Sequence, residues 1–342
     1  MKNIQVLDCT LRDGGYINNW GFGRNNIKEI IAKLTCAKID IIECGFLVNQ
    51  RFNRDCSVFN CIENIAEYIY PKKKGFMYVA MLKLGQNEME FERISDHQIE
   101  FIDGIRIVFK ENEIDKALDY AKKLSNKGYK VFMHPAKTNL YEINSLLDLI
   151  VRINDLNPYA FYIVDTFGSM NSKDVLNLFK LIDDNLNEKI KIGFHSHNNL
   201  ELSFANAKTI IDIETERKMI IDSSISGMGR GAGNLSTELF AKYLNDNVKT
   251  QYEITHLRDI YDEYLAEIFE KTPWGASPNY RLSAIYNCHP DYASFLIKQN
   301  VTSSELINNL FEEIPLAERK VYNESIICDL LKQNLGQGQL SR

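Results

Sequence analysis

Features that would point to a membrane or a nucleic-acid partner are missing from this sequence. None of its apolar runs is long enough to cross a bilayer, and the N-terminal MKNIQVLDCT lacks the apolar stretch and cleavage site of a signal peptide. The 40 Lys and Arg residues are outnumbered by 46 Asp and Glu residues, and the one basic block, at residues 72–74, is typical of a solvated turn. We therefore expect a cytoplasmic protein that binds neither membranes nor nucleic acid.

The sequence also lacks paired cysteines. Its seven cysteines are scattered singly and form no CxxC motif. An odd number of isolated cysteines argues against a disulfide framework and against a structural zinc site. Cys9 and Cys44 fall within strand-like segments, and we expect all seven side chains to be buried, reduced thiols.

The chain contains a repeated alternation of short β-branched or aromatic segments with amphipathic helical ones. Two clear helical segments lie at 25–36 and 113–128, and a glycine closes the second. Strands are predicted at residues 4–10, 39–47, 75–84, 104–110, 129–137, 160–168, 191–198 and 219–229. Eight strands separated by helices predict a closed (β/α)8 TIM barrel rather than an open, doubly wound sheet.

The alternation stops near residue 250, where the pattern becomes helical and more polar. We therefore predict a catalytic barrel at residues 1–248 and a C-terminal helical extension at 249–342, with a loop at 272–281. The extension could mediate dimerisation, cover the barrel mouth or contact a partner protein. We expect the protein to be a homo-oligomer.

Polar residues at the carboxyl ends of strands indicate a metal site, because catalytic residues of such barrels collect there. His195 and His197 lie two apart at the end of the seventh strand, so both side chains point to the same side. Asp13 follows the first strand, which lies close by once the barrel closes. Nitrogen and oxygen ligands without thiolate suit manganese, magnesium or another octahedral ion. The alternative is a pair of hydrogen-bonded core histidines.

Three segments resemble a known superfamily. DCTLRDGG (8–15), GFHSHNNLELSFANA (193–207) and GMGRGAGN (227–234) are similar to signature segments of the DRE-type TIM-barrel metallolyases, which include HMG-CoA lyase. The resemblance covers residues 4–245. Within that superfamily YIVDTFGSM (162–170) is most similar to the 4-hydroxy-2-oxovalerate aldolases.

This resemblance implies a set of metal ligands and a catalytic arginine. Asp13, His195 and His197 match the ligands of the family, and Asn234 matches an asparagine that approaches the metal in some members. The ion implied is a divalent metal, Mn²⁺ first, with Mg²⁺, Co²⁺ and Zn²⁺ as alternatives. Arg12 matches the arginine that stabilises the enolate and contacts substrate.

Further residues are expected in or near the cavity. Glu43 matches a catalytic position at the end of the second strand, where a structural ion pair is the alternative. His134, Asp165 and Thr166 are expected to bind substrate, although a strand-end histidine such as His134 is more often structural.

The sequence departs from the aldolases in its acid and base groups. Tyr16 stands where they have a histidine, and it needs help from the metal or Arg12 to act as a base near neutral pH. DYASFL (291–296) resembles an aldolase segment and suggests Tyr292 as a proton donor or acceptor. Packing of a helix face is the alternative for Tyr292. For His289, which precedes Pro290, a turn role is expected. Lys83 and Arg106 could hold an anionic substrate or form ion pairs inside the barrel.

The expected function is a metal-dependent aldolase that cleaves a hydroxy-2-oxo acid to an aldehyde and a pyruvate enolate, or runs in reverse. Claisen-type condensation of an acyl-CoA with a 2-oxo acid would use the same metal site and is the alternative. A non-catalytic binding barrel is a third interpretation. Related aldolases pass their aldehyde product to a dehydrogenase, so the resemblance also implies a dehydrogenase as a candidate partner.

Overall fold

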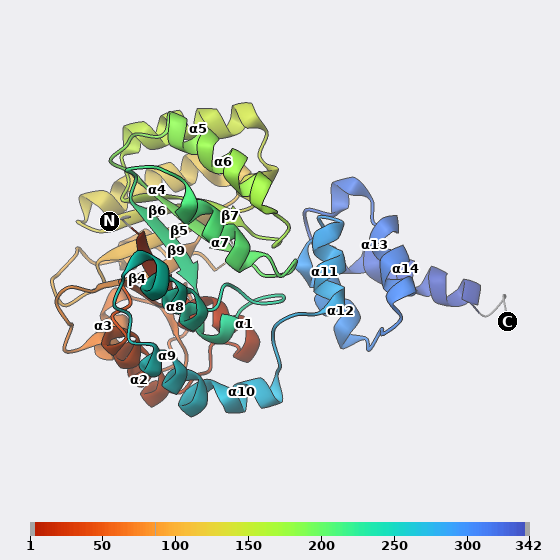
Figure 1. Cartoon of the computed structure of the whole chain (residues 1–342), viewed down its shortest axis with the longest axis horizontal. Coiled ribbons are helices and arrows are strands. Elements are labelled where there is room, and N and C mark those ends of the chain that lie inside the picture. Colours follow the sequence, from red (N-terminus) through yellow and green to blue (C-terminus); the bar gives the residue numbers. More distant parts are fainter. Residues whose placement is uncertain (1–3, 86, 339–342) are drawn as a thin grey trace.

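The computed structural model describes residues 4–85 and 87–338 and has parallel strands arranged as a closed barrel (Figure 1). The barrel strands are β1 (Ile4–Asp8), β2 (Ile41–Leu47), β4 (Met77–Lys83), β5 (Gly104–Phe109), β6 (Lys130–Pro135), β7 (Ala160–Asp165), β8 (Lys191–Ser196) and β9 (Met219–Ser223). The barrel closes because β1 pairs with both β9 and β2. The short β3 (Val58–Phe59) adds to the carboxyl end of β2. The predicted (β/α)8 barrel is confirmed.

Helices surround the barrel and connect its strands. They are α1 (Gly15–Asn18), α2 (Arg24–Cys36), α3 (Ile62–Ile69), α4 (Ile114–Asn126), α5 (Ile143–Leu156), α6 (Ser172–Asn185), α7 (Ser203–Asp212) and α8 (Thr237–Val248). Short helical turns lie at Phe91–Arg93, Glu111–Glu113, Thr138–Leu140 and Ile225–Gly227. The helices predicted at 25–36 and 113–128 are therefore confirmed to within two residues at each end.

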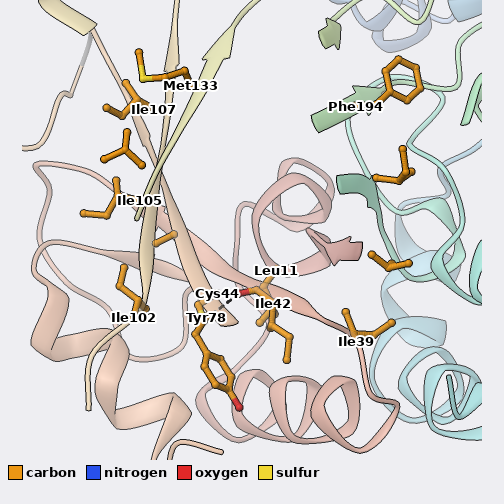
Figure 2. Close-up of a cluster of buried hydrophobic side chains, with 14 of the residues drawn as sticks. Leu11, Ile39, Ile42, Cys44, Tyr78, Ile102, Ile105, Ile107, Met133 and Phe194 are labelled. Atoms are coloured by element: carbon orange, nitrogen blue, oxygen red, sulfur yellow. Dashed lines mark hydrogen bonds between the residues drawn. The ribbon is translucent and has the colours of Figure 1, made fainter. Parts of the chain in front are cut away.

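The alternation of side chains along each strand divides the core into two layers. On β5 and β6, Ile105, Ile107 and Met133 face the helices and belong to the main core between strands and helices (Figure 2). Tyr162 and Val164 on β7 belong instead to a smaller cluster inside the barrel. Because odd and even positions separate in this way, Arg106 and His195 face inward while their strand neighbours face outward.

The strands end earlier than the sequence predicted. Strand β1 stops at Asp8 instead of residue 10, and β9 stops at Ser223 instead of residue 229. In both places the chain turns into the segments that carry the polar signature residues. A π-helical turn at Thr10–Gly14 follows β1, and turns of this kind are common at functional sites.

The C-terminal helices confirm the predicted helical extension and form two groups. They are α9 (Ile254–Ile260), a π-helical turn (Tyr261–Leu265), α10 (Ala266–Lys271), α11 (Pro278–Ile285), α12 (Pro290–Lys298), α13 (Ser304–Glu313), a short turn (Leu316–Glu318) and α14 (Glu324–Gly338). Leu257, Ile260 and Leu265 pack into the main barrel core. Helices α11 to α14 build a separate small core beside the barrel mouth (Figure 1).

Burial of the cysteines differs from the expectation. All seven are free thiols, but only Cys9, Cys44 and Cys288 are buried. Cys36 is exposed because it ends α2 on the outer face of the barrel, and the remaining three are partly exposed. Within residues 4–85 and 87–338, the helices include none with both the length and the apolar content needed to cross a membrane.

Candidate metal centre and active site

A cavity of about 170 Å³ opens at the carboxyl ends of the barrel strands. The lining divides by burial. The buried polar side chains are Arg12, Asp13, His134, His195 and His197. The apolar part includes Phe46, Met81, Leu84, Phe109 and Val164. The more exposed part includes Tyr16, Lys83, Lys110, Lys137, Thr166, Arg230 and His289. The cavity therefore runs from a buried polar end to a cationic mouth.

The π-helical turn after β1 fixes two of these residues. The backbone N–H groups of Arg12 and Asp13 both donate to the carbonyl of Cys9, at 3.0 and 2.8 Å. Thr10 Oγ1 accepts a hydrogen bond from the N–H of Ile225 at 2.8 Å, which joins this turn to the chain after β9. The turn is thus anchored on both sides, and Arg12 and Asp13 project from it into the cavity.

Two predicted metal ligands, Asp13 and His195, lie together in the buried part of the cavity, and His197 lies slightly further from Asp13. Asp13 Oδ2 lies 3.2 Å from His195 Nε2 and 4.0 Å from His197 Nε2. Ligand atoms around one octahedral ion are about 3 Å apart at adjacent positions. Neither carboxylate oxygen of Asp13 forms a regular hydrogen bond in the described part of the chain, although Oδ2 also lies 3.2 Å from Arg12 Nη1 and Asp13 is only 1% exposed. A buried carboxylate without a regular hydrogen bond fits a divalent cation held between it and the imidazoles.

Cys9 also lies near this group. One ligand atom each of Cys9, Asp13 and His195 lie within 4.8 Å of one another. Burial raises the pKa of the Cys9 thiol well above its usual range. Cys9 is therefore a neutral thiol near the site, and the oxygen and nitrogen donors remain the better ligands for a hard divalent ion.

Electrostatics hold two ligands in the forms that bind cations. Burial would raise the pKa of Asp13, but the charges of Arg12 and the two imidazoles outweigh it and keep that pKa well below its usual value. Burial, aided by nearby positive charge, lowers the pKa of His197 to about 4. Asp13 is thus an anion and His197 a neutral imidazole at neutral pH, as metal ligation requires.

His195 is positioned by a residue that the sequence patterns did not single out. Its Nδ1 lies 3.1 Å from Asp222 Oδ2, so Asp222 orients the ring and leaves Nε2 facing Asp13. Burial opposes a rise in the pKa of His195, but the contacts with Asp13 and Asp222 raise it. A cation binding at Nε2 would displace that proton. The sequence signal for Asp222 was a lone carboxylate within the apolar β9 segment MIIDS.

Asn234 lies beside the ligand pair. Its backbone forms an isolated bridge with His197, and its side-chain Nδ2 donates to the carbonyl of Met228 at 3.2 Å. The Oδ1 atom of Asn234 is buried and has no partner among the described residues. That oxygen is consistent with the predicted role near the metal.

The glycine-rich loop around Asn234 is a tight turn. A Cβ on Gly229 would lie 2.2 Å from Asn234 Nδ2, and one on Gly233, whose φ is +81°, would lie 2.0 Å from the carbonyl oxygen of Gly227. These glycines allow the loop to fold on itself. The loop also places Arg230 in the cavity lining.

Arg12 and Glu43 lie together, as an ion pair at the buried end of the cavity. Arg12 Nε donates to Glu43 Oε2 at 2.8 Å, and Nη1 lies 3.2 Å from Asp13 Oδ2. The remaining nitrogen, Nη2, is buried without a hydrogen-bond partner within the described ranges. Arg12 is therefore held by two carboxylates with one donor still available for a ligand.

Arg106 and Glu43 belong to a charged network inside the barrel. Arg106 is 0% exposed, its Nη1 lies 2.7 Å from Glu43 Oε2, and its Nη2 bonds Asp222. Of the two roles open for Arg106, the structure shows the interior ion pair. Glu43 likewise has the ion-pair role that the sequence left as an alternative.

His134 and Thr166 both line the cavity, and Tyr16 does so at its exposed side. His134 Nε2 accepts a hydrogen bond from Arg106 Nε at 3.1 Å, and burial together with the charge of Arg106 lowers the His134 pKa well below its usual range. Burial and nearby Asp13 raise the pKa of Tyr16. Both effects favour the neutral phenol, which can donate a hydrogen bond.

Four predicted site residues are not part of the cavity lining: Glu43 and Asn234, which contact lining residues, and Tyr292 and Asp165. Tyr292 is 0% exposed in the core of the C-terminal helices, and its hydroxyl donates to the carbonyls of Glu318 and Val321, both at 3.1 Å. Asp165 accepts hydrogen bonds from the N–H groups of Ser169 and Met170, both at 3.0 Å. The contacts of Tyr292 and Asp165 are those of residues that stabilise a helical unit and a turn.

We predict that Asp165→Asn alters stability rather than substrate binding. Burial raises the pKa of Asp165 to about 6 from 3.8. A raised pKa gives stability that is present below pH 4 and is lost as pH rises through 6, by about 3 kcal/mol at most. We therefore compare the free energy of unfolding of the native protein with that of Asp165→Asn. The native value minus the variant value should fall as the pH rises from 4 to 7. Urea unfolding at several pH values measures this difference, with Asp148→Asn at an exposed position as the control. A raised KM, together with a difference in unfolding free energy that does not change with pH, would contradict the prediction.

The C-terminal helices contribute His289 to the cavity. His289 is the N-cap of α12, so the expected turn role is found, but the ring also lines the cavity and lies 3.3 Å from Arg230. Asp291 pairs with Arg230 at 2.7 Å, and Lys137 Nζ donates to the carbonyl of Lys320. This unit therefore borders the barrel mouth, a position that no local motif indicated.

Comparison with known proteins identifies the family of this fold and site. The chain is 24% identical over 283 residues to an oxaloacetate decarboxylase of Mycobacterium tuberculosis, covering 80% of this chain and 79% of that protein. It is 23% identical over 278 residues to a 4-hydroxy-2-oxovalerate aldolase of Roseiflexus castenholzii, covering 80% of each chain. The crystal structure of an N-terminal domain from a Bacteroides vulgatus protein provisionally assigned as an aldolase superposes with a TM-score of 0.72 and 27% identity, covering 86% of this chain and 96% of that one.

The family model described as HMGL-like matches residues 3–263, which include the whole barrel and the π-helical turn that carries Arg12 and Asp13. This match confirms the resemblance seen in the three signature segments. The chain therefore belongs to the HMGL-like family.

Proposed function

We propose that this protein is a divalent-metal-dependent aldolase that cleaves or forms a 4-hydroxy-2-oxo acid, with Mn²⁺ as its preferred ion. Asp13, His195 and His197 would hold the ion, with Asn234 beside them. The observation that carries the proposal is the buried Asp13 carboxylate, which lies 3.2 and 4.0 Å from two imidazole nitrogens, pairs with Arg12 and forms no regular hydrogen bond in the described chain. The names of the aldolase relatives support the same reaction class.

The chain's own residues complete the chemistry. Cleavage of the bond next to the ketone leaves an enolate, and a bound divalent ion supplies a Lewis acid for that charge. Arg12 Nη2 is free to donate to the same oxygen, because Nε and Nη1 are engaged by Glu43 and Asp13. Phe46 and Val164 in the lining keep water from the buried end of the cavity.

Tyr16 would need the charge of a bound ion or of Arg12 to act as the base that removes the substrate hydroxyl proton, because burial and Asp13 raise its pKa. As a neutral phenol it would donate a hydrogen bond at the exposed side of the cavity. His134 is neutral and lines the cavity, but its Nε2 already accepts from Arg106.

Decarboxylation of a 2-oxo diacid is a second candidate. It produces the same enolate and needs no base, which suits a site whose tyrosine has a raised pKa. The decarboxylase name of one relative supports it. Claisen condensation with an acyl-CoA would use the same ligands, whereas a binding barrel without catalysis would have no use for the free donor of Arg12.

The test combines metal content with activity. We expect chelator-treated protein to regain pyruvate release from a 4-hydroxy-2-oxo acid on addition of Mn²⁺, and Asp13→Asn to lose both bound metal and activity. His256→Ala, at a partly exposed position on α9, is the control and should keep both. A parallel assay with oxaloacetate detects decarboxylation, and an assay of thiol release from acetyl-CoA detects Claisen condensation. Together they distinguish these two reactions from aldol cleavage. Metal-loaded protein that releases no pyruvate from any hydroxy-2-oxo acid would overturn the proposal.

A further inference from the structure

Three lysines line one side of the cavity mouth. Lys83 ends β4, Lys110 directly follows β5, and Lys137 follows β6 by two residues. These strands are neighbours in the barrel, so the lysines form a row along three adjacent carboxyl ends, and all three line the cavity. We call Lys83, Lys110 and Lys137 the lysine row.

The positive charge of the lysine row is only partly balanced by acids among the described residues. In the part of the chain that the structure describes, no carboxylate forms an ion pair with any of the three. One carboxylate, that of Glu113, lines the same cavity and accepts the backbone N–H of Lys110 at 2.8 Å, whereas Asp291 pairs with Arg230. Partial burial and mutual repulsion lower the pKa of Lys83 and bring that of Lys137 to about 8. Cations that outnumber the acids around them favour an anionic ligand.

The lysine row shares its cavity with the proposed reaction site. The buried end offers Arg12 and the metal ligands, the middle is lined by apolar side chains such as Met81 and Phe109, and the mouth carries the lysines. A second hollow, of about 440 Å³, adjoins across Lys110 and Lys137 and adds Lys320 to its lining. The space beyond the reaction site therefore suits a chain that ends in a negative charge.

We propose that the aldehyde half of the substrate carries its own carboxylate or phosphate, which binds the lysine row. This inference rests on the proposed aldolase function, because the 2-oxo acid end occupies Arg12 and the metal ligands. In the addition direction, the enolate carbon forms a bond to the aldehyde carbon, and the aldehyde oxygen takes up a proton. The distal anion is unchanged by the reaction and only positions the aldehyde.

The experiment compares acceptors that differ only in their terminal charge. Pyruvate and Mn²⁺ are supplied with butanal or its carboxylate analogue 4-oxobutanoate, and with glycolaldehyde or glycolaldehyde phosphate. We expect kcat/KM to favour the charged member of at least one pair by about 10-fold or more, and the preference to fall with added salt. The pair in which the charged aldehyde is preferred shows whether the lysine row binds a carboxylate or a phosphate.

Variants assign the preference to the lysine row. Lys83→Met and Lys137→Met should each reduce the preference several-fold and leave kcat/KM for the neutral aldehydes nearly unchanged, whereas Lys137→Arg should preserve it. Lys122→Met, at an exposed position on α4, is the matched control. Equal use of neutral and charged aldehydes, or a preference that survives both methionine variants, overturns this inference and leaves the aldolase function standing. If no aldehyde reacts, the proposed function fails and this inference fails with it.

Discussion

Replacement of Arg106 with methionine will lower the free energy of unfolding by about 3 to 5 kcal/mol, because it removes the cation that Glu43 and Asp222 share inside the barrel. Arg106 is 0% exposed, and it lies 2.7 Å from Glu43 and bonds Asp222. Its guanidinium also lies 5.0 Å from the ring centre of Tyr162. Methionine fills similar space but supplies no charge, and neither carboxylate can reach solvent from the barrel interior.

Urea unfolding at neutral pH, followed by circular dichroism, measures this loss. Arg152→Met is the matched control, because Arg152 pairs with Asp115 on the protein surface, where an ion pair contributes less than about 1 kcal/mol. If Arg106→Met were no more destabilising than the control, the buried network would not hold the barrel together. If Arg106→Met fails to fold, Arg106→Lys is used instead. Lysine keeps the charge but lacks the planar guanidinium that contacts both carboxylates, so this variant should fold and show an intermediate loss of unfolding free energy.

The same network links barrel stability to the site. Asp222 contacts both Arg106 and His195, and Glu43 contacts both Arg106 and Arg12. The ion pairs that neutralise charge inside the barrel thus also orient a proposed metal ligand and the proposed enolate donor. The interior of this barrel is organised around charged contacts at its carboxyl end and apolar packing elsewhere.

Much of this arrangement follows from local sequence patterns. The eight strand segments predicted the barrel, because each is a short apolar run between amphipathic helices. The two-residue period of a strand placed His195 and His197 on the same side, and barrel closure brought Asp13 near them, one strand beyond β9. These inferences needed only periodicity and the topology of a closed sheet.

Contacts between distant segments could not be predicted in this way. The lysine row comes from three separate strand ends, and its members become neighbours only once the order of the barrel strands is known. Tyr292 sits in a segment that resembles an aldolase motif, yet its hydroxyl bonds carbonyls of its own helical unit. A short motif specifies residue types, whereas the packing of the C-terminal helices determines where the side chain lies.

A second large effect is expected at Arg12, which lines the cavity, whereas the buried Arg106 and Arg217 do not. Arg12 Nη2 is buried without a partner among the residues described, while Nε and Nη1 contact Glu43 and Asp13. A preorganised donor facing a developing oxyanion contributes about 10²- to 10³-fold to kcat. Arg12→Met should therefore lower kcat for pyruvate release by that factor, provided that the proposed reaction is the one catalysed.

The variant should lose rate without losing metal, and this difference separates a catalytic donor from a structural one. Asp13, His195 and His197 remain in place, so Mn²⁺ content should stay near that of the native protein, and Glu43 keeps Arg106 as a partner. Arg12→Lys keeps the positive charge but cannot contact Glu43, Asp13 and substrate at once, so it should recover only part of the rate. Unchanged kcat in Arg12→Met would remove the arginine from the chemistry, whereas parallel loss of metal and rate would make it a support for Asp13.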